Sequence, residues 1–315
     1  MAVLRVVDLN GFDRILLVAN PVSGGGRAGR AAGRAAEGLR ALGCRPELVH
    51  TEAAGDGLAA ARDAGDERCL LVAVGGDGTV NELLNGADLE RHTLTVVPCG
   101  TGNVFAKELG IGKDPERVVE QWRSGRVVRL DVGRCNGRRF ASMFGAGIDA
   151  HAVQRVTEAR SGTLTQLHYL PSVARALLRV PRWYIGAEID GEAAVRCAQQ
   201  VVVGNSCSYG GPVQMTPAAA PNDGLLDVMS ARLNGPLRVA GVLSCCVLRS
   251  LHLSRLVSYR RGRRVRVTAA REGVPYELDG EPAGVLPAEL AVESAALRVL
   301  APASFHPVRR EPADS

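Results

Sequence analysis

Residues 72–82 organise the chain, and they read Val72-Ala73-Val74-Gly75-Gly76-Asp77-Gly78-Thr79-Val80-Asn81-Glu82. The apolar run from Cys69 to Val74 predicts a short buried strand, and the apolar residues after Thr79 have helical spacing. The glycines between strand and helix let the backbone approach a phosphate closely, and we expect some of them at φ > 0. The first N–H groups of the helix lack partners within it and can point at the anion.

Asp77 lies in the middle of this turn. A carboxylate beside phosphates is favourable when a cation such as Mg²⁺ lies between them. The alternative is a tight turn without a ligand, since Asp-Gly turns are common. The stretch by itself leaves both interpretations open.

A similar junction lies near the start of the chain. Arg14 to Ala19 predicts a buried strand, and Ala28 to Leu42 predicts a helix. The turn between them reads Asn20-Pro21-Val22-Ser23-Gly24-Gly25-Gly26-Arg27. It lacks the Gly-Lys-Ser/Thr ending of the P-loop, so it is not a Walker motif.

A third junction follows the predicted strand Thr93–Pro98, where Cys99-Gly100-Thr101-Gly102-Asn103 precedes a predicted helix at Val104–Leu109. A further strand is predicted at Glu47–Thr51. Strands that alternate with helices predict a parallel sheet, and the turns at the carboxyl ends of such strands face one crevice. We therefore expect the three glycine turns to converge on one phosphate chain.

After residue 126 the pattern changes to short strand-like runs bounded by Gly, Asn or Pro, which predict an antiparallel sandwich. These runs are Val127–Val132, Phe140–Phe144, Tyr184–Ile189, Cys197–Val203, Gly224–Leu233, Arg264–Thr268, Tyr276–Leu278 and Leu297–Leu300. Helix-like stretches interrupt them at Ala150–Leu178 and Pro236–Leu256. We therefore predict an α/β domain over residues 1–130 and a β-rich domain over residues 131–315.

The composition is that of a globular protein, with 46% hydrophobic and 23% charged residues among 315. A net charge of +5 favours contact with anionic material but does not mark a nucleic-acid binder. The eight cysteines include no Cys-x-x-Cys pair, which is typical of reduced thiols in the cytoplasm. Because Arg238 and Arg249 interrupt the longest apolar stretch, we expect a soluble protein.

The three turns together resemble the diacylglycerol kinase catalytic-domain superfamily. The matching residues are Asn20-Pro21 with Ser23-Gly24, Gly75-Gly76-Asp77-Gly78-Thr79, and Pro98-Cys99-Gly100-Thr101-Gly102-Asn103. NAD kinases and 6-phosphofructokinases share the Gly-Gly-Asp-Gly motif, so it indicates the superfamily and not the substrate. Val104 stands where many members carry Asp, which puts a carboxylate role at that position in doubt.

Segments of the second half resemble the lipid kinases more than the NAD kinases. They are Asn205-Ser206, Tyr209-Gly210-Gly211, residues 217–228 and Glu277-Leu278-Asp279-Gly280-Glu281-Pro282. The resemblance implies an N-terminal α/β domain with a parallel sheet and a C-terminal, mainly antiparallel β-sandwich. It also implies that the last strand returns towards the N-terminal domain.

The resemblance implies an ATP-dependent kinase that transfers the γ-phosphate to a lipid hydroxyl, with diacylglycerol as the leading acceptor and phosphatidic acid as its product. The alternative is an NAD kinase-like kinase of a soluble substrate. ATP and Mg²⁺ are the expected co-substrate and cofactor. The expected nucleotide site comprises Asn20, Pro21, Val22, Ser23, Gly24, Thr51, Gly75, Gly76, Asp77, Gly78, Thr79, Val80, Asn81, Glu82 and Thr101.

Acidic residues are expected to do the chemistry. Asp77 would orient Mg²⁺, Glu281 would take the proton of the lipid hydroxyl, and Asp279 would bind the metal or orient Glu281. Without the resemblance, Asp279 and Glu281 could equally form a charged hairpin tip. The resemblance also implies a structural Mg²⁺ held by the Asp223 carboxylate and the carbonyls of Ala220 and Leu225, where the alternative is a plain turn.

The expected partners are a membrane lipid substrate and the inner face of the membrane, which the cytoplasmic protein would visit transiently. No nucleic acid is expected, and a homodimer stays open. A run of basic residues is either a solvated face or a contact with anionic headgroups. It comprises Arg255, Arg260, Arg261, Arg263, Arg264 and Arg266.

Overall fold

The computed structural model describes residues 8–159, 183–208, 214–233, 235–247, 254 and 256–306. They form two compact units, which we call unit 1 and unit 2. Unit 1 comprises the described residues up to Val132 and those from Ser294 onward. Unit 2 comprises Gly133–Glu293. The predicted fold class, an α/β domain with a parallel sheet and an antiparallel β-sandwich, is confirmed.

Unit 1 is built on a parallel sheet in the order β2-β1-β3-β4, followed by the end of β16. The strands are β2 (Pro46–His50), β1 (Arg14–Ala19), β3 (Cys69–Gly75), β4 (Thr93–Pro98) and β16 (Ala288–Ala301). β3 and β4 are buried along their whole length, which explains their continuous apolar runs.

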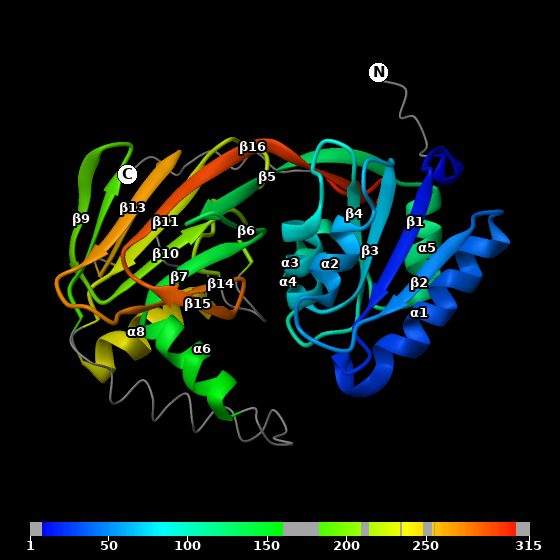
Figure 1. The fold of residues 1–315 in the computed structure, drawn as a ribbon. Helices are drawn as coiled ribbons and strands as arrows, with labels where there is room; N and C mark the ends of the chain where they lie inside the picture. Colours follow the sequence, from blue (N-terminus) through cyan, green and yellow to red (C-terminus); the bar gives the residue numbers. More distant parts are fainter. Residues whose placement is uncertain are drawn as a thin grey trace. The chain divides into compact units, whose positions relative to one another are not determined.

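Helices cover both faces of this sheet (Figure 1). α1 (Ser23–Ala41) packs with α5 (Pro115–Arg123) on one face, and α2 (Asp56–Arg62) packs with α3 (Asp77–Gly86) on the other. A short helix, α4 (Val104–Leu109), follows β4, and a 3₁₀ turn, η1 (Leu9–Gly11), precedes β1. α5 was not predicted, although the Asp114 cap and Pro115 at the first helical position are signals of a helix start.

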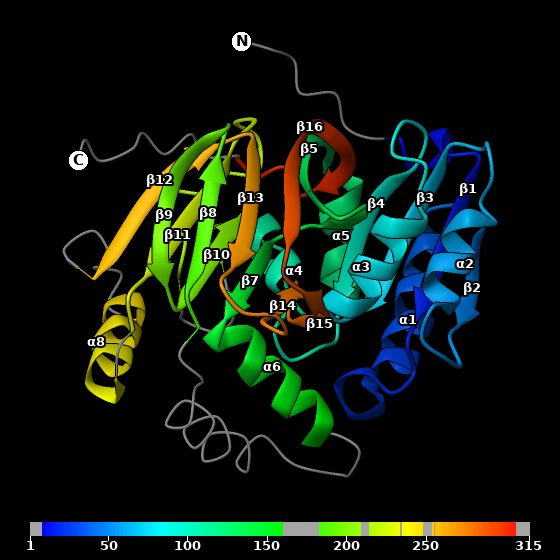
Figure 2. The ribbon, with the colours of Figure 1, turned by 60° about the vertical axis from the view of Figure 1, so that its left-hand side comes forward.

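Unit 2 is a sandwich of two antiparallel layers (Figures 1 and 2). One layer has the order β12-β11-β10-β7-β14-β15, with strands Val257–Gly262, Leu226–Ala231, Gln200–Gly204, Met143–Gly147, Pro275–Leu278 and Glu281–Val285. The other contains β16, β13 (Arg264–Ala269), β8 (Ile185–Ile189) and β9 (Glu192–Ala198), with β5 (Arg126–Cys135) and β6 (Arg138–Phe140) beside β16. Side chains of both layers, including Phe144, Val201 and Val267, form its core.

The strand β16 belongs to both units. Its residues Ala288–Ala291 pair antiparallel with β13, and Arg298 and Val299 pair parallel with β4. The chain also passes from unit 1 to unit 2 within β5, which pairs with β16.

The helix-like stretches begin as α6 (Ile148–Ala159) and α8 (Pro236–Val247). Most of their predicted remainder, together with Tyr209-Gly210-Gly211 and Arg255, lies outside the described residues. Three strands were not predicted: β9, β12 and β15, whose charged or glycine-containing sequences hide the apolar alternation. No described helix has the length and apolar character needed to cross a bilayer.

Candidate active site

The three glycine turns of unit 1 meet at the carboxyl ends of β1, β3 and β4. A Cβ placed on Gly100 would lie 2.6 Å from the Cα of Gly76, and one on Gly24 would lie 2.2 Å from the carbonyl oxygen of Cys99. The amides of Cys99 and Gly100 both donate to the carbonyl of Gly75, at 2.8 and 3.3 Å. The predicted convergence of the turns is therefore observed within this unit.

One of the two predicted reasons for glycine, positive φ, does not apply to the central turn. Gly75 and Gly76 do not have positive φ, Gly76 having φ −101°, and Gly78 is helical. A Cβ on Gly75 would instead lie 2.3 Å from the hydroxyl oxygen of Thr79. Gly75 and Gly76 need glycine because their neighbours approach closely, whereas the first turn has left-handed glycines at residues 24–26.

Helix α3 begins at Asp77 without any side chain capping its start. Helix N-termini that follow a glycine turn are common binding sites for anions, because their first amides point out of the helix. The Oδ1 of Asp77 accepts a hydrogen bond from the amide of Phe105, at 3.1 Å. This bond joins the start of α3 to the start of α4 and fixes the half-buried carboxylate in the turn.

Asn103, quoted in the third motif but not chosen as a site residue, is buried at φ 48°. Its Nδ2 donates to the carbonyl of Gly100 at 2.7 Å, while its buried Oδ1 makes no hydrogen bond within the described part of the chain. Buried polar atoms are normally satisfied, so this oxygen marks Asn103 as a further candidate for ligand contact.

The first turn brings Asn20 and Thr51 together. Asn20 Oδ1 accepts from the amide of Val22 at 3.2 Å, and the Thr51 amide donates to Ala19, the residue before Asn20, at 2.9 Å. The amide of Ser23 donates to the carbonyl of Asn20. The side chains of Val22 and Thr101 are exposed. The strands β1 and β2 thus place these residues at one end of the sheet.

Four of the predicted residues, Thr79 to Glu82, lie further along α3. Thr79, Val80 and Asn81 are buried. The two oxygens of Glu82 accept from the amides of Gly55 and Gly57, each at 2.9 Å, and so hold the start of α2.

In unit 2, Asp279 and Gly280 form the two-residue turn between β14 and β15. The Asp279 carboxylate accepts three hydrogen bonds, from the amides of Ala141 (2.8 Å), Ser142 (2.8 Å) and Met143 (3.0 Å). Asp279 therefore anchors the turn to the chain between β6 and β7.

The Glu281 carboxylate is accessible to solvent. Its side chain is 46% exposed, and its Oε2 lies 2.9 Å from a guanidinium nitrogen of Arg138. An accessible carboxylate beside a cation can accept a proton from a substrate hydroxyl. Asp279 lies in the turn itself, whereas Glu281 is the first residue of β15.

The expected cation site at Asp223 has suitable oxygen atoms. Asp223 Oδ1 accepts from the amide of Leu225 at 3.0 Å, and the Ala220 carbonyl accepts from Asn222 at 2.8 Å. The buried Oδ1 of Asn222 has no hydrogen-bond partner within the described ranges. One carboxylate with carbonyl oxygens fits a hard cation such as Mg²⁺. Among the described residues, three or more His, Cys, Asp or Glu do not gather at any point as metal ligands would.

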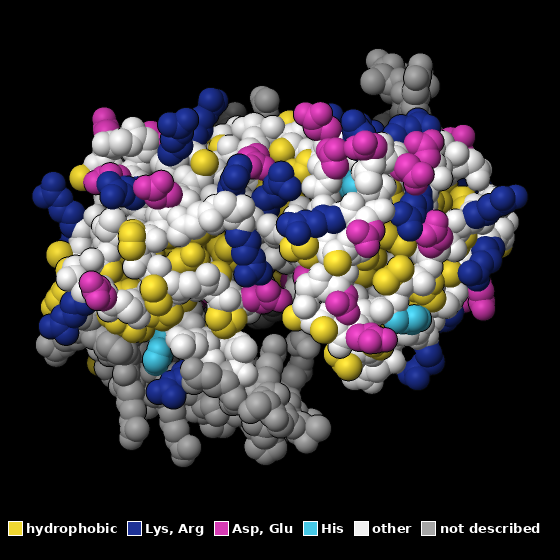
Figure 3. Space-filling model, viewed as in Figure 1, with side chains coloured by type: hydrophobic (Ala, Val, Ile, Leu, Met, Phe, Trp, Pro, Cys, Tyr) yellow, Lys and Arg dark blue, Asp and Glu magenta, His cyan; other side chains and the backbone are white. Residues whose placement is uncertain are grey.

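The run of basic residues does not form a single face. Arg261 is mostly buried, where its Nε donates to fully buried Asp227 at 3.0 Å and its Nη2 lies 3.9 Å from Asp223. Burial raises the pKa of Asp227, while the hydrogen bond from Tyr259 and the charge of Arg261 oppose that change. On the face drawn in Figure 3, basic and acidic side chains are interspersed.

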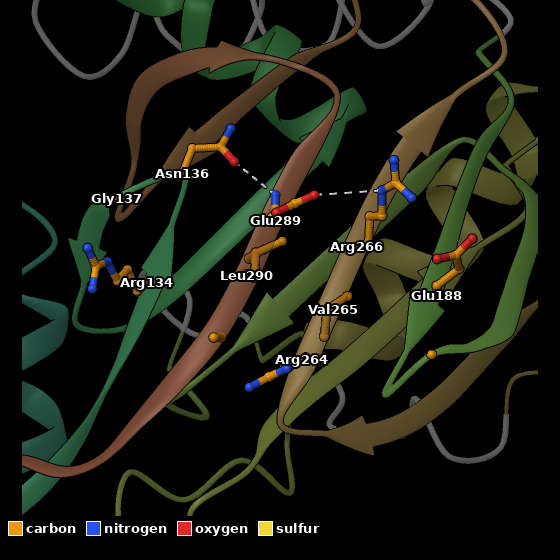
Figure 4. A pocket seen from close by; sticks show the side chains of 11 residues that line it. Arg134, Asn136, Gly137, Glu188, Arg264, Val265, Arg266, Glu289 and Leu290 are labelled. Atoms are coloured by element: carbon orange, nitrogen blue, oxygen red, sulfur yellow. Dashed lines mark hydrogen bonds and ion pairs between the residues drawn. The ribbon is translucent and has the colours of Figure 1, made fainter.

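A polar cavity of about 560 Å³ lies over β13, β16 and β8 of unit 2 (Figure 4). Arg134, Arg264 and Arg266 line it together with Glu188 and Glu289, and Arg266 is paired with Glu289 at 3.9 Å. None of the predicted site residues is among its lining residues.

The family described as the diacylglycerol kinase catalytic domain matches residues 14–135, and the YegS C-terminal NAD kinase beta sandwich-like domain matches residues 142–301. A diacylglycerol kinase of Bacillus subtilis is 31% identical over 284 residues, covering 88% of this chain and 92% of that protein. One from Mycobacterium tuberculosis is 30% identical, covering 92% and 95%. The chain belongs to the diacylglycerol kinase family.

Membership of the diacylglycerol kinase family makes the chain a kinase. The family also includes a relative described as a probable lipid kinase, YegS-like, from Chromohalobacter salexigens, 29% identical over 72% of this chain and 75% of that protein. The fold agrees with a solved structure titled as a diacylglycerol kinase from Bacillus anthracis, with a TM-score of 0.71, 19% identity and coverage of 94% and 99%.

Proposed function

We propose that this kinase uses ATP to phosphorylate the hydroxyl group of a membrane lipid, with diacylglycerol as acceptor and phosphatidic acid as product. The convergence of three glycine turns at an uncapped helix start carries the proposal. Such an arrangement suits a chain of phosphates, and the names of the relatives point to the lipid.

In unit 1, the amides at the start of α3 and the turns at Gly24 and Gly100 bind the phosphates of ATP. Asp77, held by the Phe105 amide, would hold the cation that accompanies these phosphates. When bound, Mg²⁺ neutralises charge on the phosphates. Asn20, Ser23, Thr51 and Thr101 contribute polar contacts around the nucleotide.

In unit 2, Glu281 removes the proton from the lipid hydroxyl. The hydroxyl oxygen of the lipid bonds to the γ-phosphorus of ATP while the bond from that phosphorus to the ADP oxygen breaks. A carboxylate suffices as base because the transition state is loose and the proton moves late. Asp279 orients Glu281 through its three amide contacts. Asp223, with the carbonyls of Ala220 and Leu225, would hold a second Mg²⁺ that stabilises the loop before β11.

A kinase assay with labelled ATP and Mg²⁺ tests the proposal. Vesicles containing diacylglycerol, phosphatidylglycerol, a sphingoid base or a polyprenol are compared with NAD in solution. We expect label in phosphatidic acid, and turnover reduced about 10²-fold or more by Asp77→Asn or Glu281→Gln. Glu272→Gln, at an exposed position of unit 2, is the control.

Label in NAD and in no lipid would establish the alternative, a kinase of a soluble substrate. Activity of Glu281→Gln within about threefold of the unaltered protein would show that Glu281 is not the base.

A further inference from the structure

Glu277 is a fully buried carboxylic acid of β14 that the proposed mechanism does not use. Its Oε2 accepts a hydrogen bond from the amide of Gly280 at 2.6 Å. Gly280 is the residue directly before Glu281, so Glu277 holds the backbone from which the proposed base extends.

The turn that contains Gly280 has a demanding conformation. Asp279 and Gly280 have φ of 51° and 85°, as expected for a two-residue hairpin turn whose central residues are both left-handed. The Asp279 side chain fixes one side of this turn to the amides of residues 141–143. The bond from the Gly280 amide to Glu277 fixes the other side.

The second oxygen of Glu277 lies beside Asp149, in the first turn of α6. A Cβ on Gly145 would lie 2.7 Å from Oε1 of Glu277 and 2.1 Å from Oδ2 of Asp149, so only glycine leaves room for both oxygens. Helix α6 packs against β14 and β15, as both ribbon views show. The two acids are therefore neighbours across Gly145, where the start of α6 packs against the hairpin.

Two buried carboxylates can be close neighbours when they share a proton. Burial first, and then the charge of Asp149, raise the pKa of Glu277 well above its usual range. The hydrogen bond from the Gly280 amide lowers this pKa, while the charges of Asp279 and Glu281 raise it. The start of α6 favours negative charge on Asp149. The Oε1 of Glu277 is buried without a hydrogen-bond partner within the described residues, while its Oε2 accepts from the amide of Gly280.

We propose that Glu277 is a positioning residue for Glu281, because its carboxyl group accepts the Gly280 amide and packs beside Asp149 at the start of α6. The inference rests on the proposed role of Glu281 as base. It adds a second support for the turn, independent of Asp279, and makes α6 part of the structure that presents Glu281.

Glu277→Gln and Glu277→Leu form a matched pair of variants. Glutamine keeps an oxygen for the Gly280 amide and an N–H for Asp149, whereas leucine has a similar volume and neither group. With ATP and diacylglycerol vesicles, we expect Glu277→Leu to lower kcat about tenfold or more while KM for ATP changes less than about twofold. Glu277→Gln should retain kcat within about threefold.

Hydrogen exchange at the Gly280 amide gives a readout that does not depend on activity. Exchange should become about tenfold faster in Glu277→Leu and stay unchanged in Glu277→Gln. If the unaltered protein phosphorylates no lipid, the proposed function fails, and this measurement still decides whether Glu277 holds the turn.

An unchanged kcat in Glu277→Leu, a Glu277→Gln variant as slow as the leucine variant, or unchanged exchange in both would overturn the inference. If Glu277→Leu does not fold, Gly145→Ala replaces it, because the added methyl group separates the two carboxyl groups. The same loss of kcat and faster exchange are then expected, and their absence would contradict the inference.

Discussion

Individual glycines in unit 1 are required by contact with neighbouring backbone. At Gly76 and Gly100 two turns of the backbone approach so closely that a side chain on either glycine would contact the other. Neither residue has positive φ. A motif of glycines therefore reports the packing of two turns against each other, in addition to the approach of a phosphate.

Gly100→Ala should separate these turns, since the new methyl group would lie 2.6 Å from the Cα of Gly76. We expect the free energy of unfolding to fall by about 1–3 kcal/mol and KM for ATP to rise, because overpacking shifts the backbone. Denaturant unfolding and kinase assays measure both. Gly112→Ala, where a Cβ has nothing within 4 Å, is the control, and equal behaviour of the two variants would contradict the prediction.

The cysteines offer a chemical test at the same scale. Burial raises the pKa of Cys69 in β3 to about 12 and that of Cys135 to about 11, whereas Cys197 is exposed. At pH 8 the thiolate of Cys69 is therefore scarce, and its access is blocked. Iodoacetamide followed by mass spectrometry should label Cys197 and spare Cys69 until the protein is unfolded. Rapid labelling of native Cys69 would show that β3 is not buried as described.

Among the elements, α2 and α3 depend on each other through one carboxylate. Helix α2 is short, and its N-terminal cap, Gly55, supplies no side-chain hydrogen bond. Glu82 of α3 provides the missing acceptor for two amides at that end. A residue next to the glycine motif thus serves the neighbouring helix.

Glu82→Ala should lower the free energy of unfolding by about 1–3 kcal/mol, because two amides lose their acceptor. KM for ATP should change less than about threefold, since the side chain is occupied within the fold. Glu90→Ala, at an exposed position, provides the comparison in thermal melts. A large rise in KM with unchanged stability would instead support a direct nucleotide contact.

At the scale of the whole molecule, β16 completes unit 1 from the far end of the sequence. Arg298 and Val299 pair with β4, and the carbonyl of Leu300 accepts the hydroxyl of Thr95 at 3.0 Å. Without that segment the buried strand β4 would become an edge, and exposed apolar edges promote aggregation.

Residues 1–132 expressed alone should therefore be less stable than unit 1 within the full chain and prone to associate. Joining residues 294–306 to their C-terminus through a flexible linker should restore a monomer with a cooperative melt. Light scattering and circular dichroism measure the difference. A fragment 1–132 that is monomeric and equally stable would show that β16 is dispensable.

The sequence predicted much of unit 1 because its signals are local. β1, β4 and α4 begin and end where their apolar runs and glycines indicated. α5 and β12 were missed, since their charged residues lie among the apolar ones that face the core. The carboxylate pair was also missed: Glu277 and Asp149 are 128 residues apart and come together only across Gly145.

The order of residues alone determined the alternation of strands and helices, the three glycine turns and the superfamily they indicate, because each depends on neighbours within one element or turn. Tertiary structure decided which glycines contact which backbone, which acids are buried, and which amides hold Asp279. Those outcomes depend on the distance between atoms from separate strands, and hydrogen bonding and desolvation act only once the fold has brought them together.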